Sequence, residues 1–328
     1  MIFADCPLDQ AEGAILAHSI PLWDTRLRKG LVLGPSEIEA LREAGLDTVT
    51  VARLETHDVG ENDAATRVAR AMVPDPSEAF VRVGRASTGR VNIHAIGPGV
   101  AAFDAQAIAR ANLIDPMITV ATVPQFARVW DRALLATVKI ISYGVPRTSL
   151  REVEAILADA FRVRPVIMRS ATLIETVIGD GGPTKGEAAI RARLERMGMD
   201  LCEVVHVPHE VNPLAAAIAE AQGDIVLVLT ASATSDLRDT APEALRQAGG
   251  QVTRFGMPVD PGNLLFTGGL GAVPVIGLPG CARSPALNGA DWVLERVVCG
   301  IDVTDRDIAA MGVGGLLKEI PQRGRPRE

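Results

Sequence analysis

From about residue 165 onward, short apolar segments alternate with amphipathic ones, and this alternation limits the fold more than any other feature of the chain. The segment IVLVL at 225–229 is apolar on both faces, as a central strand of a parallel sheet requires. Segments with helical periodicity precede it at 190–197 and 212–223. The pattern predicts a three-layer, doubly wound α/β domain with a mostly parallel sheet.

The residues before this domain follow different patterns. A Pro-Asp-Pro break at 74–76 ends an N-terminal α/β segment, and β-branched runs at 118–123 and 137–142 indicate a strand-rich mixed region that closes with a connecting helix. We therefore predict a smaller mixed α+β N-terminal part over 1–75 and 76–163, the α/β domain over 164–305, and a tail or linker over 306–328. That tail ends in PQRGRPRE, which is rich in Pro and Arg and has no periodicity.

Composition excludes several classes of function. A formal net charge of −7 and 3% aromatic residues argue against a nucleic-acid surface. The four cysteines stand far apart and no histidine lies at ligand spacing, so the sequence predicts neither a metal site nor a disulfide framework. No apolar run reaches the roughly 18 residues of a membrane helix. We expect a cytoplasmic protein.

Local signals place further elements in the α/β domain. The segment VIMRS at 166–170 predicts a short strand, and Asn212 followed by Pro213 predicts the N-cap of the helix that ends near Gly223. A capping-box pattern from Thr240 to Glu243 predicts a second helix start.

Two loops of small and polar residues follow predicted strands, at 230–239 and 279–284. In an open α/β sheet, ligands bind in the crevice outside the carboxyl ends of the strands, so the two loops predict one shared pocket. Hydroxyls at Ser232, Thr234 and Ser235, with the amides of the following helix, would hold a phosphate or carboxylate. The alternative is that these small residues only turn the chain into the helix.

Several segments of the α/β domain resemble one family in the right order. They are LVLT at 227–230, RDTAPEA at 238–244, MPVDPGN at 257–263 and PVIGLPG at 274–280. They resemble the molybdopterin-binding domain family of molybdenum cofactor biosynthesis, which includes molybdopterin adenylyltransferases and molybdotransferases. CARSP at 281–285 and MGVGGLL at 311–317 resemble bacterial members often fused to a molybdenum cofactor cytidylyltransferase domain.

The resemblance implies a ligand and a set of site residues. The ligand is molybdopterin or its nucleotide or metal form, with Mg²⁺ as an optional second cofactor. The implied cofactor-binding residues are Thr230, Ser232, Ala233, Thr234, Ser235, Arg238, Asp239, Pro279, Gly280, Cys281 and Ser284. Asp239 is also the candidate catalytic residue.

Each implied role has a structural alternative. Asp239 fits a helix-cap acid, Arg238 and Lys185 fit solvated surface cations, and His209 fits a histidine with ordinary partners. Cys281 is either a soft ligand for copper or molybdenum or an inert buried thiol.

The chain also departs from the family at its phosphate loop and beside its active site. Residues 232–235 read SATS where the family usually has a glycine-rich loop, and His209 follows Pro208 where the family usually has Asp. Losing that carboxylate weakens the argument for Mg²⁺-assisted transfer.

Two functions follow from the resemblance and its departures. One is a cofactor biosynthesis protein that binds molybdopterin and presents it for nucleotidyl or metal transfer, whether or not it catalyses the step. Its partners would be a molybdenum cofactor nucleotidyltransferase or a molybdoenzyme, and the family implies a homo-oligomer. The alternative is a degenerate structural or oligomerisation module that has lost pterin binding.

Overall fold

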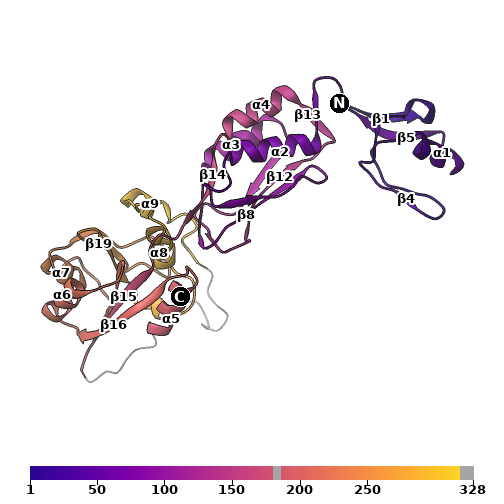
Figure 1. The fold of residues 1–328 in the computed structure, drawn as a ribbon. Helices are drawn as coiled ribbons and strands as arrows, with labels where there is room; N and C mark the ends of the chain where they lie inside the picture. The colour runs from indigo at the N-terminus through magenta and orange to yellow at the C-terminus, as the bar shows by residue number, and fades with distance from the viewer. Residues whose placement is uncertain (180–185, 318–328) are drawn as a thin grey trace. The chain divides into compact units, whose positions relative to one another are not determined.

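The computed structural model describes residues 1–179 and 186–317, and the chain forms two compact units (Figure 1). The first comprises Met1–Gly97 and Ala101–Val163, and the second comprises Pro98–Val100 and Arg164–Glu328. No helix within the described ranges is both long enough and apolar enough to cross a membrane.

The N-terminal unit is built on small sheets, four of which are antiparallel. One has the strand order β1-β5-β2, another β10-β12-β8-β7, and further sheets pair β11-β9-β14, β13-β6 and β3-β4. Three helices of this unit, α2, α3 and α4, contribute buried residues to one apolar cluster with the sheet of β8 and β12. The strands before residue 166 are β1 (Ile2–Pro7), β2 (Ile15–Leu16), β3 (Ile20–Pro21), β4 (Arg26–Leu27), β5 (Thr48–Arg53), β6 (Asp58–Gly60), β7 (Val81–Val83), β8 (Arg90–Ala95), β9 (Gly99–Phe103), β10 (Ile118–Thr122), β11 (Arg128–Val129), β12 (Leu134–Ile140), β13 (Gly144–Pro146) and β14 (Phe161–Pro165). The helices of this unit are η1 (Leu8–Gln10), α1 (Pro35–Glu43), α2 (Glu61–Met72), α3 (Ala105–Ile114) and α4 (Arg147–Ile156).

The C-terminal unit contains a six-stranded sheet in the order β16-β15-β17-β20-β19-β18. The first four strands are parallel to one another, β19 is antiparallel to β20, and β18 is antiparallel to β19 and so runs in the direction of the first four. The predicted α/β class with a mostly parallel sheet is therefore confirmed. The strands are β15 (Ser170–Val177), β16 (Asp200–Pro208), β17 (Ile225–Leu229), β18 (Gln251–Phe255), β19 (Phe266–Leu270) and β20 (Val273–Leu278). The helices are α5 (Gly186–Glu195), α6 (Val211–Glu220), α7 (Thr240–Gln247), η2 (Gly280–Arg283), α8 (Gly289–Val298) and α9 (Asp305–Ala310).

The centre of this sheet is apolar because its central strand, β17, is buried on both faces, as the sequence predicted. All five residues of β17 are buried between parallel neighbours. Val226 and Val228 pack with Leu214 of α6 and Leu245 of α7 in one cluster. A Cβ on Gly277 of β20 would lie 1.8 Å from the Phe266 ring, so only glycine leaves room for that buried ring.

Three local predictions are wrong in detail. Residues 166–169 connect strands, and the strand begins at Ser170. Helix α6 begins at Val211 with Glu210 at its N-cap, while the Asn212 side chain accepts a hydrogen bond from Gln247 at 2.8 Å. Helix α7 begins at Thr240 as expected, but its N-cap is Asp239. Because a cap needs a side chain aimed at free amides, residue type alone did not locate the caps.

Candidate functional site

The carboxyl ends of β15, β16, β17 and β20 meet at one edge of the sheet, because these strands are parallel neighbours. The loop 230–239 follows β17, and η2 with the residues up to 288 follows β20. A hydrogen bond joins the two loops: Arg283 Nη2 donates to the Thr230 carbonyl at 2.8 Å. The structure therefore brings together the two loops that the sequence singled out.

The loop after β17 is anchored at its beginning by the end of strand β15. Thr176, at the end of β15, accepts a hydrogen bond from the Ala231 N–H at 2.8 Å and lies 2.9 Å from His209 Nδ1. The backbone N–H of His209 also donates a hydrogen bond to the Val177 carbonyl at 2.8 Å. His209 thus links the end of β15 to the end of β16, beside the predicted site.

Asp239 holds the other end of the same loop. Its carboxylate accepts hydrogen bonds from the Ser235 N–H at 2.9 Å and the Thr240 N–H at 2.7 Å. Burial tends to raise the pKa of Asp239, but these two amide hydrogen bonds and the nearby His209 outweigh it, so the pKa lies below its usual value. The start of α7 already has an anion, supplied by the chain itself.

That arrangement narrows where an external anion would bind. The backbone N–H groups of Ser232, Ala233 and Thr234 make no hydrogen bond to any residue in the described ranges. Residues 232 and 233 are exposed, whereas the Thr234 side chain is buried 3.4 Å from the Thr230 hydroxyl. The tip of the loop therefore presents free amide donors.

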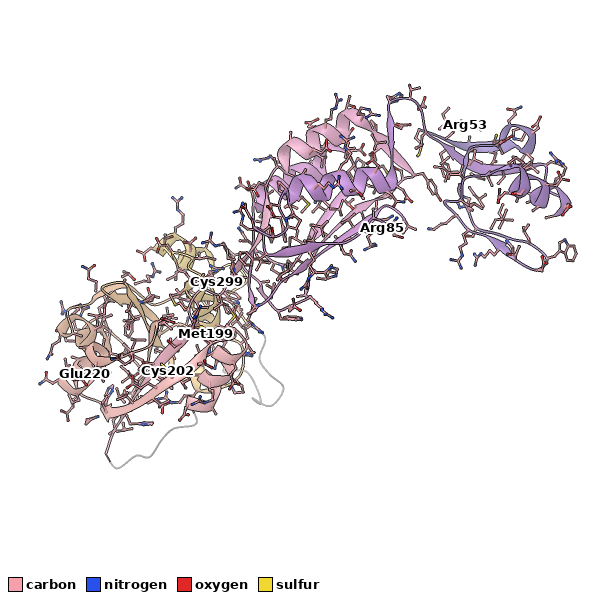
Figure 2. All side chains as sticks on the ribbon, in the orientation of Figure 1. Arg53, Arg85, Met199, Cys202, Glu220 and Cys299 are labelled. Atoms are coloured by element: carbon pink, nitrogen blue, oxygen red, sulfur yellow. The ribbon has the colours of Figure 1, made fainter. Side chains whose placement is uncertain are left out.

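The remaining predicted residues differ in exposure. Ser235, Arg238 and Gly280 are exposed, Cys281 and Ser284 are partly buried, and Pro279 is buried. The four cysteines are free thiols, and Figure 2 marks exposed Cys202 and buried Cys299. Lys185 and the Pro- and Arg-rich segment 321–328 lie outside the described residues.

Arg193 of α5 is a residue that the sequence analysis missed. Its guanidinium donates to the carbonyls of Ala282 at 2.8 Å, Ser284 at 2.8 Å and Ala286 at 3.0 Å. It also pairs with the Asp291 carboxylate of α8 at 2.7 Å, and the two side chains are 2% and 6% exposed. One buried cation therefore fixes the whole segment after β20.

A signal for Arg193 was present in the sequence. Ile190, Leu194 and Met197 were assigned to the buried face of a helix, and Arg193 stands three residues after Ile190 on that same face. A long cation at a buried helical position needs a partner, so the position of Arg193 in the sequence already indicates an internal ion pair, which we did not predict.

Glu175 on β15 was also missed, because the strand was predicted over 166–170 and not over Ser170–Val177. Its side chain is fully buried, and Oε2 lies 3.2 Å from His206 Nε2 on the neighbouring strand β16. Acids are rarely buried without partners, so the pair belongs to the structure of this sheet.

Two other features lie away from the predicted site. A cavity of about 630 Å³ in the C-terminal unit is lined by Thr267, Val273 and Pro274, at the end of β20 opposite the two loops. In the N-terminal unit, Glu55, His57 and Asp58 place potential metal-ligand atoms within 4.8 Å of one another. The N-terminal ammonium group already binds both carboxylates of that group, at 2.6 Å and 2.7 Å.

Similarity to solved structures is broad in extent but low in score. The chain is 12% identical to a molybdopterin biosynthesis MoeA protein from Pyrococcus horikoshii, covering 94% of this chain and 75% of that one with a TM-score of 0.29. The chain is also 12% identical to a molybdenum cofactor biosynthesis protein from Pyrococcus furiosus, covering 93% of this chain and 66% of that one with a TM-score of 0.26. It is 18% identical to the molybdopterin biosynthesis enzyme MoaB from Thermus thermophilus, covering 46% of this chain and 100% of that one with a TM-score of 0.27.

Family models match two parts of the chain. Residues 5–53 match a family described as a domain of unknown function, and a comparison with curated proteins gives no match. Residues 181–297 match the family described as a probable molybdopterin binding domain. The second match falls on the segment whose motifs indicated that family. The C-terminal unit therefore carries a molybdopterin-binding domain of molybdenum cofactor biosynthesis.

Proposed function

We propose that the C-terminal unit binds a molybdopterin-type ligand at the carboxyl edge of β15, β17 and β20. The observation that carries the proposal is the hydrogen bond from Arg283 to the Thr230 carbonyl, which joins the two loops that carry the family motifs. The ligand phosphate would meet the free amides of 232–234, and the pterin end would lie toward the segment fixed by Arg193. Asp239 orders the loop and supplies a carboxylate near the reacting end.

The bound cofactor would be presented for nucleotidyl or metal transfer in the cytoplasm. The partner enzyme would be a molybdenum cofactor nucleotidyltransferase or a molybdoenzyme, and Mg²⁺ would be needed only if this chain catalyses the step. In this proposal the domain is three-layered, with α6 and α7 on one face of the sheet, and works as a homo-oligomer.

Titration of the full chain with molybdopterin, under anaerobic conditions, tests the binding step. Ala233→Glu places a negative charge at the tip of the loop, and we expect it to weaken binding at least about tenfold through repulsion of the ligand phosphate. Ala272→Glu is the matched control, because Ala272 is an exposed alanine in the turn at the opposite end of β20. Equal affinities for the two variants would place the ligand elsewhere.

Turnover is tested separately, by adding molybdate, Mg²⁺ and ATP or CTP to the loaded protein. If the chain catalyses transfer, Asp239→Asn should lower the rate by at least about tenfold, in the range of acid–base contributions, while the fold remains intact. Binding without turnover would assign the chain a holding role.

One observation favours the alternative of a structural module that has lost pterin binding. The Asp239 carboxylate occupies the amides of Ser235 and Thr240, which would otherwise be offered to a ligand. Under this alternative, molybdopterin at micromolar concentration fails to bind, and the oligomeric state measured by analytical ultracentrifugation is the same with and without it.

A further inference from the structure

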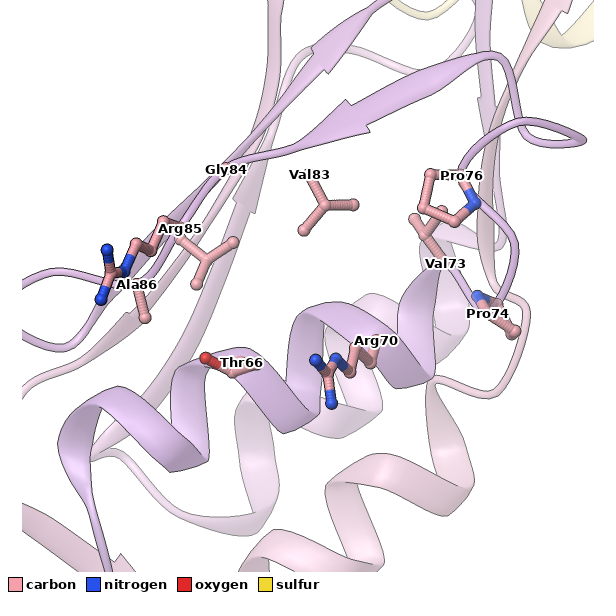
Figure 3. Close-up of a pocket in the computed structure, with 10 residues that line it drawn as sticks. Thr66, Arg70, Val73, Pro74, Pro76, Val83, Gly84, Arg85 and Ala86 are labelled. Carbon is pink, nitrogen blue, oxygen red and sulfur yellow. The ribbon is translucent and has the colours of Figure 1, made fainter.

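A cavity of about 490 Å³ lies in the N-terminal unit between helix α2 and strand β7 (Figure 3). We call it the α2 cavity. Thr66 and Arg70 of α2 line one side of it, and Arg85 and Ala86, which follow β7, line the other. Its volume is within the range of about 300–1,000 Å³ that small-molecule sites have.

The local sequence explains why this space is left open. Strand β7 is only three residues long. The Gly84 N–H still donates to the Asn92 carbonyl at 2.8 Å, but Arg85 and Ala86 make no backbone pairing with β8 before Ser87 pairs with Arg90. On the other side, Pro74 and Pro76 line the cavity just beyond the end of α2, where proline prevents the helix from continuing over the sheet edge. Neither element covers the corner between them.

The cavity combines an apolar floor with two cations. Val73 and Val91 are each 1% exposed and belong to the core of this unit, whereas Arg70 and Arg85 are exposed. Thr66 and Arg70 stand at i and i+4 and so share one face of α2, and Val73 is the C-cap residue at the end of that helix. A ligand there would contact apolar side chains and guanidinium groups together.

Neither guanidinium is used within the fold. The side chains of Arg70 and Arg85 make no hydrogen bond or ion pair with any residue over 1–179 and 186–317. Nearby arginines differ: Arg67 pairs with Glu154 at 2.7 Å and Arg82 pairs with Asp131 at 3.1 Å. In a chain with a formal net charge of −7, two free arginines at one cavity make a local positive site.

One structural role accounts for only part of this arrangement. Arg70 lies in the last turn of α2, where a cation favours the helix dipole. That role does not apply to Arg85, which lies outside any helix. The acid nearest to Arg70 along the chain is Asp75, and its carboxylate is turned into its own loop, accepting from the Ser77 N–H at 2.9 Å.

We propose that the α2 cavity binds a small organic anion with an apolar body. Arg70 and Arg85 hold its phosphate or carboxylate group, and the apolar body lies against Val73, Val83 and Val91. The site belongs to the N-terminal unit and is independent of molybdopterin binding by the C-terminal unit.

The test uses fluorescence titration of the full chain with 8-anilinonaphthalene-1-sulfonate, an organic anion with apolar rings. We expect saturable binding whose Kd rises about fivefold in Arg70→Gln and in Arg85→Gln, as for a partly exposed charge pair. Ala86→Phe fills the cavity without changing charge and should abolish binding. Arg110→Gln is the matched control, because Arg110 is an exposed helical arginine on α3 away from the cavity.

Competition defines the anionic group. Displacement of the probe by phenyl phosphate identifies a phosphate site, and displacement by 4-phenylbutyrate identifies a carboxylate site. Inorganic phosphate alone should displace the probe poorly, because it lacks the apolar body. Circular dichroism and thermal melting confirm that each variant is folded.

Three results overturn the proposal. They are absence of saturable probe binding, equal effects of Arg110→Gln and the two cavity variants, and displacement by inorganic phosphate as strong as by phenyl phosphate. Binding that survives Ala86→Phe places the probe elsewhere, for example in the cavity of the C-terminal unit, and also counts against the site.

Discussion

Replacing Arg193 with methionine tests whether one buried guanidinium holds the segment after β20. The change removes the cation that faces the Asp291 carboxylate, which is 6% exposed. It also removes the donor of three carbonyls, those of Ala282, Ser284 and Ala286. Methionine keeps most of the apolar stem, so the loss is mainly electrostatic.

The structure sets the expected size of the effect. Breaking a buried ion pair by removing one partner costs about 3–5 kcal/mol, and each buried carbonyl left without a donor adds on the order of 1 kcal/mol. Because the loop can move and expose some of these carbonyls to water, we expect a total near 4 kcal/mol in the free energy of unfolding. That is a large share of the roughly 5–15 kcal/mol that stabilises a domain.

A double-mutant cycle with Asp291→Asn separates the ion pair from its surroundings. Once the carboxylate is neutral, removing the guanidinium no longer strands a buried charge. The double variant should therefore be more stable than the sum of the single losses predicts, by about 2 kcal/mol or more.

Urea unfolding followed by tryptophan fluorescence measures these free energies. Trp23 is 94% exposed and Trp130 is 61% exposed, so both can be changed to phenylalanine to leave Trp292 of α8 as reporter of the C-terminal unit. Arg191→Met is the control, because Arg191 is on the same helix and forms a surface pair with Glu187. Such pairs contribute about 0–1 kcal/mol.

The reasoning is refuted if Arg193→Met costs no more than Arg191→Met. It is also refuted if the two single losses add without coupling in the double variant.

Three further predictions concern the loop after β17 and the cysteines. The pKa of Asp239 is lower in the folded state than the unfolded value of about 3.9, so the stability that its carboxylate contributes is present at neutral pH and is lost as pH falls through the folded pKa. The difference in unfolding free energy between wild type and Asp239→Asn should therefore be constant above about pH 5 and shrink below it. A difference that does not change with pH contradicts this. Thr176→Val should cost about 1–2 kcal/mol and speed hydrogen exchange at the Ala231 amide, whose acceptor it removes; unchanged protection would count against that anchor. Burial raises the pKa of Cys299 to about 12, so iodoacetamide at pH 8 should label exposed Cys202 in the native protein and spare Cys299 until urea is added, as read by mass spectrometry; native labelling of Cys299 would disprove its burial.

The parts of the fold that the sequence predicted correctly are those with a strong local pattern. Strand β17 is apolar at every position, and the structure buries all five of its residues. The start of α7 was predicted at Thr240, since the chain there changes from a polar loop to an amphipathic helix. The class of ligand was predicted from the family motifs, because the periodicity of apolar residues carries no information about a ligand.

Strand β15 was predicted at 166–170 and not over Ser170–Val177, because polar residues occupy buried positions in it. Thr172, Glu175 and Thr176 are each 0% exposed. Their partners come from other strands and loops: Glu203, His206 and the Ala231 amide. A buried polar residue is tolerated only when it is hydrogen-bonded, and a single sequence does not state which distant group supplies the bond.

The sequence by itself determined the alternation of strands and helices, the order of the family motifs, and the two loops at the ends of β17 and β20. Only the tertiary structure decided which atoms in those loops are free. Asp239 binds amides of its own loop, and Arg193 reaches Asp291 across 98 positions of sequence. The physical reason is that periodicity reports which face of an element is buried, whereas the partner of a polar group depends on which segments the folded sheet places side by side.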